Sequence, residues 1–281
     1  MEHGIGLPTT VSGVAGRDLI EWASRAEEAG FTTLGVLDRL VYGNHEPVVA
    51  LAAAAAATSR IRLATTILIA AYRANLPLLA KQLATLDQVS GGRLVVGVAA
   101  GGRPDDFAWS GVPYHRRGRL LDSLIQQLPK IWSGESGVGP LPLNDPPLLV
   151  GGHSPAALRR AARYGHGWIM GGSSVTPPAA LIAQFRDLWR AHGRTGPPRI
   201  VALAYYALGP RALERAQAHL RAYYAPADGY AERVAASVLT HSRAIQDATA
   251  RYADAGCDEL LFFPCVGGAD QLDRLVDGLG E

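Results

Sequence analysis

The sequence has few cysteines, little lysine and no long apolar run. Cys257 and Cys265 are too few for a disulfide framework and lack the spacing of a metal site. The longest apolar run, residues 48–57, is about half of the roughly 20 residues that a transmembrane helix needs. The first residues lack the basic and apolar regions of a secretory signal peptide. We therefore expect a cytoplasmic protein with reduced cysteines and no membrane partner.

Charge and composition narrow the class of protein further. Lys and Arg number 27 and Asp and Glu 25, so the formal net charge is +2 and gives no electrostatic reason to expect nucleic acid. Hydrophobic residues make up 48% of the chain, which excludes a disordered protein and supplies material for a core. The sequence contains no Walker loop, no Gly-x-Ser-x-Gly elbow and no cluster with metal-ligand spacing, so we expect no metal.

Short aliphatic segments alternate with segments of helical periodicity along the whole chain. We expect strands at Ile5–Leu7, Thr33–Leu37, Ile61–Ile69, Leu94–Val98, Leu148–Val150, Trp168–Met170, Ile200–Leu208 and Glu259–Phe263. We expect helices at Asp18–Ala29, Pro47–Ala57, Pro77–Val89, Arg116–Trp132, Pro155–Tyr164, Pro178–Ala191, Ala212–Tyr224, Tyr230–Leu239, Arg243–Ala255 and Ala269–Leu279. Eight apolar strands, each followed by a helix, predict a parallel α/β architecture, a single (β/α)8 TIM barrel over residues 1–281.

The ends of the predicted fifth and sixth strands carry glycine-rich turns. The fifth runs into Gly151, Gly152, His153 and Ser154, and a helix follows. Glycines permit close approach of a ligand, and a helix N-terminus offers free N–H groups, so this turn predicts a phosphate site. The sixth strand ends in a second turn, made by Gly171, Gly172 and Ser173. Both turns could equally be ordinary strand-to-helix connections.

Other strand ends supply candidate ring contacts and titratable groups. Gly101, Gly102 and Arg103 follow the fourth strand, and these small residues leave room for a flat ligand while the arginine could hold a phosphate or a ring carbonyl. The third strand leads into Ala70, Ala71 and Tyr72, where the tyrosine could stack on a ring. Candidate acids or bases are Asp38, Tyr72, His115 and His153. The pattern predicts a planar, phosphate-bearing ligand that carries most of the chemistry.

Several stretches, in order along nearly the whole chain, resemble the luciferase-like monooxygenase superfamily. The most specific is residues 76–94, which run LPLLAKQLATLDQVSGGRL. Similar matches are Gly111-Val112-Pro113, the turn around Gly151 and Gly152, and residues 255–260 before the last strand. The resemblance implies a TIM-barrel enzyme that uses reduced FMN or the deazaflavin coenzyme F420.

The resemblance also implies roles for particular positions. Gly101 and Gly102, with Gly151, Gly152 and Ser154, would help to hold the cofactor. A non-prolyl cis peptide would back the ring around Ala70–Ala71. An acidic residue followed by histidine often ends the second strand in the family. Here Asp38 is kept but arginine stands at position 39, which argues against a histidine proton relay at that point. A homodimer through residues 47–57 and 76–89 is also implied.

Four functions remain open at this level. The sequence favours a monooxygenase that uses reduced FMN and oxygen on a small organic substrate, because Ala70–Ala71 is similar to the flavin branch and the acid–histidine pair is broken at position 39. Such an enzyme would need a separate flavin reductase, since no Gly-x-Gly-x-x-Gly fingerprint follows a strand. The alternatives are an F420-dependent reductase or dehydrogenase that transfers hydride, and a non-catalytic flavin-binding barrel. A sugar-phosphate isomerase or aldolase is disfavoured, because Lys81 and Lys130 both lie in predicted helices.

The substrate is not identified by the sequence. Its pocket would be shaped by residues 102–115 and 133–147, both expected as loops, and by the aromatic residues Tyr205 and Tyr206 and residues 223–230. These aromatic side chains could equally belong to the core.

Overall fold

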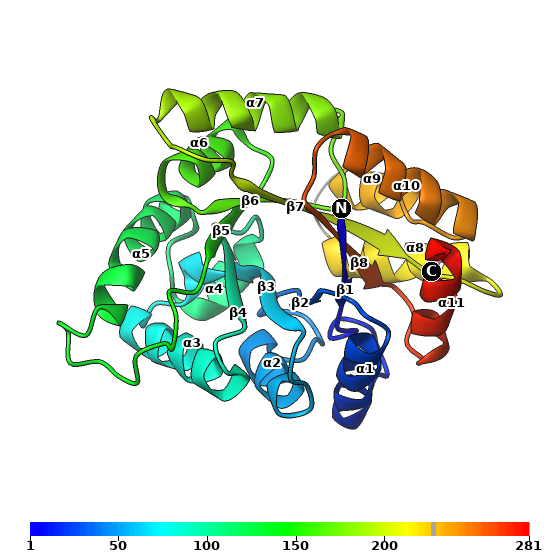
Figure 1. Cartoon of the computed structure of the whole chain (residues 1–281), viewed down its shortest axis with the longest axis horizontal. Helices are drawn as coiled ribbons and strands as arrows, with labels where there is room; N and C mark the ends of the chain where they lie inside the picture. The colour runs from blue at the N-terminus through cyan, green and yellow to red at the C-terminus, as the bar shows by residue number, and fades with distance from the viewer. Residues whose placement is uncertain (226–228, 281) are drawn as a thin grey trace.

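The computed structural model describes residues 1–225 and 229–280 of the chain. Eight parallel strands form a closed barrel in the order β1 to β8, and β1 pairs with β8 to complete it (Figure 1). The strands are β1 (Glu2–Gly6), β2 (Thr33–Val36), β3 (Arg62–Ile69), β4 (Leu94–Ala99), β5 (Leu148–Gly151), β6 (Gly167–Met170), β7 (Arg199–Tyr206) and β8 (Glu259–Pro264). The predicted (β/α)8 TIM barrel is confirmed.

Helices surround the barrel and cover its outer face (Figure 1). They are α1 (Gly16–Glu28), α2 (Pro47–Ala56), α3 (Leu76–Ser90), α4 (Pro104–Ser110), α5 (Arg117–Trp132), α6 (Pro155–Tyr164), α7 (Pro178–Ala191), α8 (Ala212–Tyr224), α9 (Tyr230–Ala236), α10 (Ser242–Asp254) and α11 (Asp270–Leu279). Two short 3-10 helices are η1 (Ala70–Tyr72) and η2 (Tyr114–Arg116). No helix in the described ranges is long and apolar enough to cross a membrane.

Local sequence signals account for where these helices begin and end. Asn75 precedes α3 and its side chain accepts a hydrogen bond from the N–H of Leu78 (3.0 Å). Gly91 ends the same helix with a φ of +69°, a left-handed conformation that glycine adopts without steric cost. The apolar stripe of α1 is buried, as its periodicity predicts.

The predicted loop over residues 102–115 is only partly a loop. It contains α4, which begins at Pro104 and ends at Gly111 (φ +70°), and it also contains η2. Helix α4 buries only Asp106 and Phe107. A helix of so few turns with two buried side chains gives no periodicity that the sequence could reveal.

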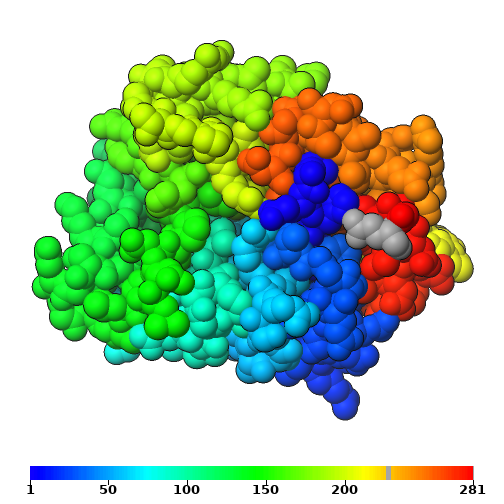
Figure 2. All heavy atoms as spheres, viewed as in Figure 1, coloured from blue at the N-terminus to red at the C-terminus, as the bar shows by residue number. Residues whose placement is uncertain are grey.

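Charged side chains close the N-terminal end of the barrel. In Figure 2 the dark-blue start of the chain lies near the middle of this face, where β1 begins. Buried Glu259 accepts hydrogen bonds from Thr32 Oγ1 (2.8 Å) and from Arg199 (2.9 Å), and Arg62 pairs with it at 3.3 Å. Both arginines also pair with Glu2. Every charged side chain in this cluster has a partner, so we assign a structural role to the cluster. Barrel enzymes carry their active sites at the opposite end, where the strands have their C-termini.

Candidate functional site

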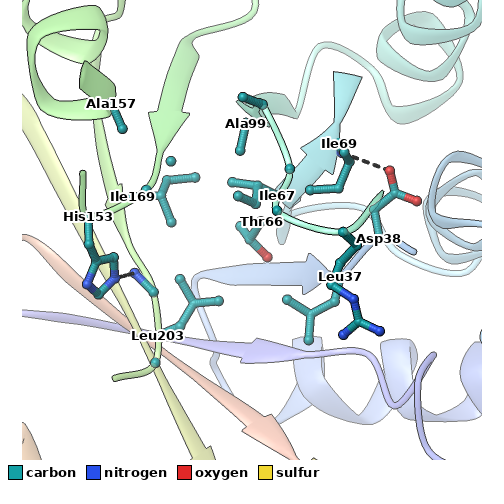
Figure 3. A pocket seen from close by; sticks show the side chains of 18 of the residues that line it. Leu37, Asp38, Thr66, Ile67, Ile69, Ala99, His153, Ala157, Ile169 and Leu203 are labelled. Carbon is teal, nitrogen blue, oxygen red and sulfur yellow. Dashed lines mark hydrogen bonds between the residues drawn. The ribbon is translucent and has the colours of Figure 1, made fainter. Parts of the chain in front are cut away.

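A cavity of about 450 Å³ opens at the C-terminal ends of the strands (Figure 3). Apolar side chains from four strand ends form much of its wall: Leu37, Ile67, Ile69, Ile169 and Leu203. Glycine-rich turns form another part, and the ends of α8 and α9 complete it. An apolar slot with a few converging polar groups is the usual form of a cofactor site, and this one lies where barrel enzymes place their chemistry.

The turn between β5 and α6 brings backbone close to the cavity. A Cβ atom on Gly151 would lie 2.7 Å from Ile67 Cδ1, so a larger residue would fill the slot. Gly152 has a φ of +124°, and its carbonyl accepts a hydrogen bond from Trp168 Nε1 (2.8 Å). Ser154 caps α6 by accepting from the N–H of Ala157 (3.2 Å). The helix N-terminus therefore faces the cavity, as the sequence predicts for a phosphate site.

Arg160 also lines the cavity, and sequence reasoning missed it. It lies on α6 one turn beyond Ala157, and residues three apart share a helix face. Its Nε donates to Asp122 Oδ1 (2.5 Å), which holds the guanidinium beside the helix N-terminus. The sequence signal that could have identified Arg160 is its position three residues after Ala157, at the start of the helix that follows the glycine turn. A phosphate there would meet both helix N–H groups and a cation.

The turn after β4 is tightly packed against the cavity wall. Gly101 has a φ of +77°, and a Cβ atom on it would lie 2.5 Å from Ile69 Cγ2. Gly102 follows, and its carbonyl accepts a hydrogen bond from Tyr114 (3.3 Å). Arg103 lines the cavity, donates to the Tyr223 carbonyl (3.3 Å) and pairs with Asp105 (3.6 Å). Arg103 is thus tied to neighbouring protein groups.

His153 lies in the cavity with one ring nitrogen engaged. Its Nε2 accepts a hydrogen bond from the N–H of Gly171 (2.8 Å), the contact drawn in Figure 3. Burial lowers the pKa of His153, so the ring is neutral near pH 7 and its proton resides on Nδ1. A Cβ atom on Gly171 would lie 2.9 Å from Nε2, and one on Gly172 would lie 2.6 Å from the Tyr205 ring. Glycine at both positions keeps this side of the cavity open.

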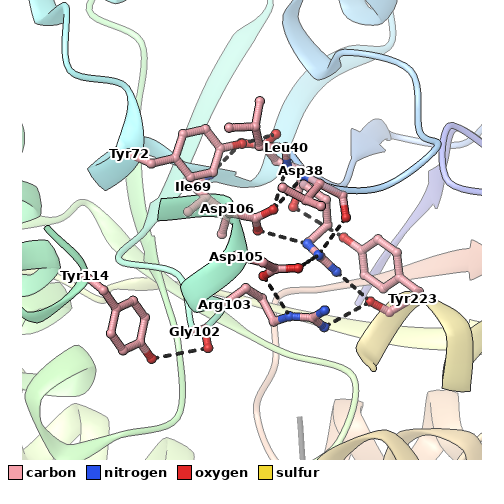
Figure 4. A network of polar contacts seen from close by, with 12 residues as sticks. Asp38, Leu40, Ile69, Tyr72, Gly102, Arg103, Asp105, Asp106, Tyr114 and Tyr223 are labelled. Carbon is pink, nitrogen blue, oxygen red and sulfur yellow. Dashed lines mark hydrogen bonds and ion pairs between the residues drawn. The ribbon is translucent and has the colours of Figure 1, made fainter. Parts of the chain in front are cut away.

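Asp38 lines the cavity and belongs to a buried polar network (Figure 4). Its carboxylate accepts hydrogen bonds from the Ile69 N–H (2.8 Å) and the Tyr72 hydroxyl (2.8 Å), and it pairs with Arg73 (3.2 Å). Burial raises the pKa of the Asp38 carboxyl, and the Arg73 charge opposes this effect. Burial and the neighbouring Asp38 charge raise the pKa of Tyr72. Both oxygens of Asp38 are therefore occupied in fixing the end of β3.

Arg39 organises a second part of the same network (Figure 4). Its Nε donates to Asp106 Oδ2 (2.9 Å), and its other nitrogens donate to the Tyr223 carbonyl (2.8 Å) and to Asp105 (3.1 Å). Asp106 also accepts from the backbone N–H of Val41 (2.7 Å). The guanidinium thus joins the β2 end, α4 and the end of α8. Arg39, which stands where the family often has histidine, therefore holds these three elements together in this chain.

Four tyrosines form the remaining wall: Tyr205, Tyr223, Tyr224 and Tyr230. The Tyr205 and Tyr224 hydroxyls share a hydrogen bond, and the Tyr223 and Tyr224 rings meet edge to face with centroids 4.9 Å apart. Burial raises the pKa of each of these phenols. The sequence leaves these aromatics open as pocket or core. The four named here line the cavity, Tyr206 belongs to the core, and residues 226–228 lie outside the described residues.

The expected cis peptide around Ala70–Ala71 is wrong in position. The non-prolyl cis bond joins Thr66 and Ile67, inside β3. The pairing of β3 with β4 shifts register between Thr65 and Leu68, so the irregular backbone lies within the strand instead of after it. Ala70 and Ala71 form η1 and are buried in the core behind the wall.

The remaining candidates lie away from the cavity. His115 is exposed on η2, and Ser173 is half-buried in the turn beyond Gly172. Tyr72 is buried beside Asp38. None of these three residues is among the described residues that line the cavity, and neither is Ala70 or Ala71. Within residues 1–225 and 229–280, no group of three or more His, Cys, Asp or Glu side chains could hold a metal ion.

His219 makes the stability of the tyrosine wall pH-dependent. Its ring stacks on Tyr223, and burial lowers the pKa of His219 to about 4. Between pH 6.5 and 4 the unfolded chain therefore binds a proton that the folded chain does not. We expect the free energy of unfolding to fall by about 2 kcal/mol as the pH drops through this window, with allowance for partial exposure. Urea denaturation at several pH values measures it.

Two variants separate this effect from general acid sensitivity. His219→Gln should flatten the pH dependence between pH 6.5 and 4, because it removes the titrating ring. His192→Gln, at an exposed histidine that ends α7, should leave the dependence as in the wild type. An identical pH dependence in wild type and His219→Gln would contradict the assignment.

Comparison with known sequences identifies the family of the chain. The profile of the luciferase-like monooxygenase family matches residues 1–275. An uncharacterized protein of Mycobacterium tuberculosis is 31% identical over 213 residues, which cover 63% of this chain and 73% of that protein. An F420-dependent glucose-6-phosphate dehydrogenase of Amycolatopsis mediterranei is 27% identical over 188 residues, which cover 59% of this chain and 56% of the relative. The chain thus matches about half the length of that dehydrogenase.

Solved structures share the fold. An F420-dependent secondary alcohol dehydrogenase, solved with an F420–acetone adduct, superposes with a TM-score of 0.82 and 18% identity over 99% of both chains. A monooxygenase from Streptomyces bottropensis gives a TM-score of 0.82 and 24% identity over 100% of this chain and 97% of its own. At these identities the likeness establishes the fold alone. Because the family profile spans nearly the whole sequence, the chain belongs to the luciferase-like monooxygenase family, whose members are oxidoreductases.

Proposed function

We propose that this chain is an F420-dependent oxidoreductase that transfers hydride to or from a small organic substrate in the cavity at the barrel mouth. The observation that carries the proposal is the glycine-lined slot. Cβ atoms on Gly101, Gly151 and Gly171 would each lie within 2.9 Å of a neighbouring side chain. Side chains there would fill space that a flat ring needs, so the residues present fit a planar cofactor.

The residues that would hold the cofactor divide into two groups. The apolar wall around Ile67 and Ile169 would contact the ring. The α6 N-terminus, Ser154 and Arg160 would take a phosphate. When bound, F420 supplies a carbon centre that gives or accepts a hydride, which is one proton with two electrons. The chain's own task is to bind, orient and keep water away.

One observation favours F420 over FMN. Two sequence relatives, at 27% and 32% identity, are F420-dependent glucose-6-phosphate dehydrogenases. The sequence favours FMN for two reasons, the similarity of Ala70–Ala71 to the flavin branch and the arginine that stands at position 39 in place of histidine. Ala70 and Ala71 are buried and absent from the cavity lining, and Arg39 is held by Asp105 and Asp106. The neutral His153 and the protonated tyrosines offer hydrogen-bond donors to a substrate.

The second candidate is a monooxygenase that uses reduced FMN and oxygen. The apolar walls favour it, because oxygen chemistry on a reduced flavin needs a site that excludes water. A solved structure of an FMN-bound Baeyer–Villiger monooxygenase shares the fold at a TM-score of 0.75 and 17% identity. This candidate needs a separate flavin reductase as partner.

Dependence on oxygen distinguishes the two. Purified protein is mixed with reduced F420 and a panel of ketones under argon, and the visible absorbance of oxidised F420 is followed. We expect the absorbance to return without oxygen. Turnover only with reduced FMN and oxygen would contradict the proposal. Binding of a cofactor without turnover in either assay would favour the non-catalytic flavin-binding barrel.

The homodimer through α2 and α3 stays a prediction. The two helices are neighbours along the chain, and each exposes an apolar side chain, Val49 at 67% and Leu78 at 50%. Covering such side chains would stabilise an interface. Light scattering of the purified protein tests it: a mass near twice 29.7 kDa is expected, and a mass near 29.7 kDa would contradict it.

A further inference from the structure

The tyrosine wall is the part of the cavity lining formed by Tyr205, Tyr223, Tyr224 and Tyr230. Its rings come from β7, α8 and α9, and their edge-to-face contacts link them into one surface. The Tyr224 and Tyr230 centroids are 5.1 Å apart, and those of Tyr205 and Tyr224 are 6.0 Å apart. Leu203 and Leu37 line the cavity beside them. This surface would contact a substrate mainly through apolar and aromatic groups.

The charges near this wall are already paired. Arg39 donates to both Asp105 and Asp106, and Arg103 pairs with Asp105. Two guanidinium groups thus face two carboxylates, and both guanidiniums also donate to the Tyr223 carbonyl. An anionic substrate near this wall would have to compete with Asp105, Asp106 and the Tyr223 carbonyl for these two guanidinium groups, which disfavours its binding there.

The hydroxyl groups of the wall can still donate hydrogen bonds. The Tyr230 hydroxyl makes no hydrogen bond within residues 1–225 and 229–280, and it would lie 3.5 Å from a Cβ atom placed on Gly171. Tyr205 and Tyr224 share one hydrogen bond, so one of the pair keeps a hydrogen to donate. Burial raises the pKa of Tyr230, so it stays protonated near pH 7.

We propose that the substrate is an uncharged, largely apolar carbonyl compound whose oxygen accepts a hydrogen bond from the Tyr230 hydroxyl. Apolar walls suit its hydrocarbon body, the paired charges beside the tyrosine wall disfavour a carboxylate or phosphate there, and the Tyr230 hydroxyl, which makes no hydrogen bond within the described residues, suits a carbonyl oxygen. The inference rests on the proposed function, because it places the substrate in the same cavity as the cofactor. It makes Tyr230 a residue that determines specificity.

Saturation-transfer NMR of the whole chain tests the substrate class without turnover. The probes are cyclohexanone, the matched anion cyclohexanecarboxylate, and glucose 6-phosphate, each with and without F420. We expect cyclohexanone to bind more tightly than either anion by at least about tenfold, since each 1.4 kcal/mol is a factor of ten. Equal or tighter binding of an anion would overturn the inference.

A pair of tyrosine variants locates the contact. Tyr230→Phe removes only the hydroxyl, and one lost hydrogen bond should weaken cyclohexanone binding by about 3- to 10-fold. Tyr42→Phe is the matched control, because Tyr42 packs edge to face on Tyr223 from outside the cavity lining. It should bind cyclohexanone as the wild type does. Equal affinity in wild type and Tyr230→Phe would overturn the role of Tyr230.

A separate titration with F420 distinguishes failure of the proposed F420-dependent function from failure of the proposed substrate class. Tyr230→Phe should bind F420 as the wild type does, because the hydroxyl is assigned to the substrate. Failure of the wild type to bind F420 would contradict the proposed function. Normal F420 binding together with a preference for anions would contradict only the substrate class.

Discussion

Gly152→Val is expected to lower the affinity for F420 by about 10- to 100-fold while the barrel remains folded. Gly152 has a φ of +124°, which valine rarely adopts, and its new Cβ atom would lie 2.9 Å from the Ala157 Cβ. The turn must therefore move, and it carries the N–H groups assigned to the cofactor phosphate. Fluorescence titration with F420 measures the affinity, and circular dichroism reports the fold.

A second glycine variant controls for backbone strain. Gly193 also has a positive φ (+67°), but it lies on an exposed turn, and a Cβ atom placed on it would have no neighbour within 4 Å. Gly193→Val should therefore strain the chain without changing F420 affinity. Equal affinities of Gly152→Val and Gly193→Val would show that the β5–α6 turn does not hold the cofactor.

Asp38→Ala is expected to lower the free energy of unfolding by about 3–5 kcal/mol, the usual effect of breaking a buried ion pair. The Asp38 side chain is 1% exposed, and it is the acceptor for the Ile69 N–H and the Tyr72 hydroxyl as well as the partner of Arg73. Arg73 would keep its ion pair with the partly exposed Glu46 and its contact with the Tyr72 ring, but it would lose its buried carboxylate partner. Urea denaturation measures the change.

An exposed ion pair serves as the comparison. Asp187 pairs with Arg190 on α7, and both side chains are more than two-thirds exposed. Asp187→Ala should change the free energy of unfolding by less than about 0.5 kcal/mol. If Asp38→Ala were no more destabilising than Asp187→Ala, the network around Asp38 would not position the end of β3 as described.

The fold follows from the sequence because its signals are local. Apolar strands buried on both faces, such as residues 61–69, and helices with clear caps, such as the one after Ser154, declare themselves through periodicity and end residues. Helix α4 is not predicted, because its seven residues are too few to show a helical period. The cis bond at Thr66–Ile67 escapes because a non-prolyl peptide isomer has no local sequence signal.

The site is less predictable because distant strand ends build it. The glycine turns at 101–102 and 151–152 are predictable from their position after strands, and the structure brings both to one cavity. The proton of His153 depends on the N–H of Gly171, which comes from the next strand. Tyr230 reaches the cavity only because α9 packs on α8, and a one-dimensional pattern cannot separate such a ring from the core.

Side-by-side titration of the protein with F420 and with FMN, followed by fluorescence, is the direct test of F420-dependent hydride transfer. We expect F420 to bind more tightly than FMN by at least about tenfold, which corresponds to 1.4 kcal/mol. Tighter binding of FMN would contradict F420-dependent hydride transfer. Failure of both cofactors to bind, in oxidised and in reduced form, would contradict the assignment of the glycine-lined cavity as a cofactor site.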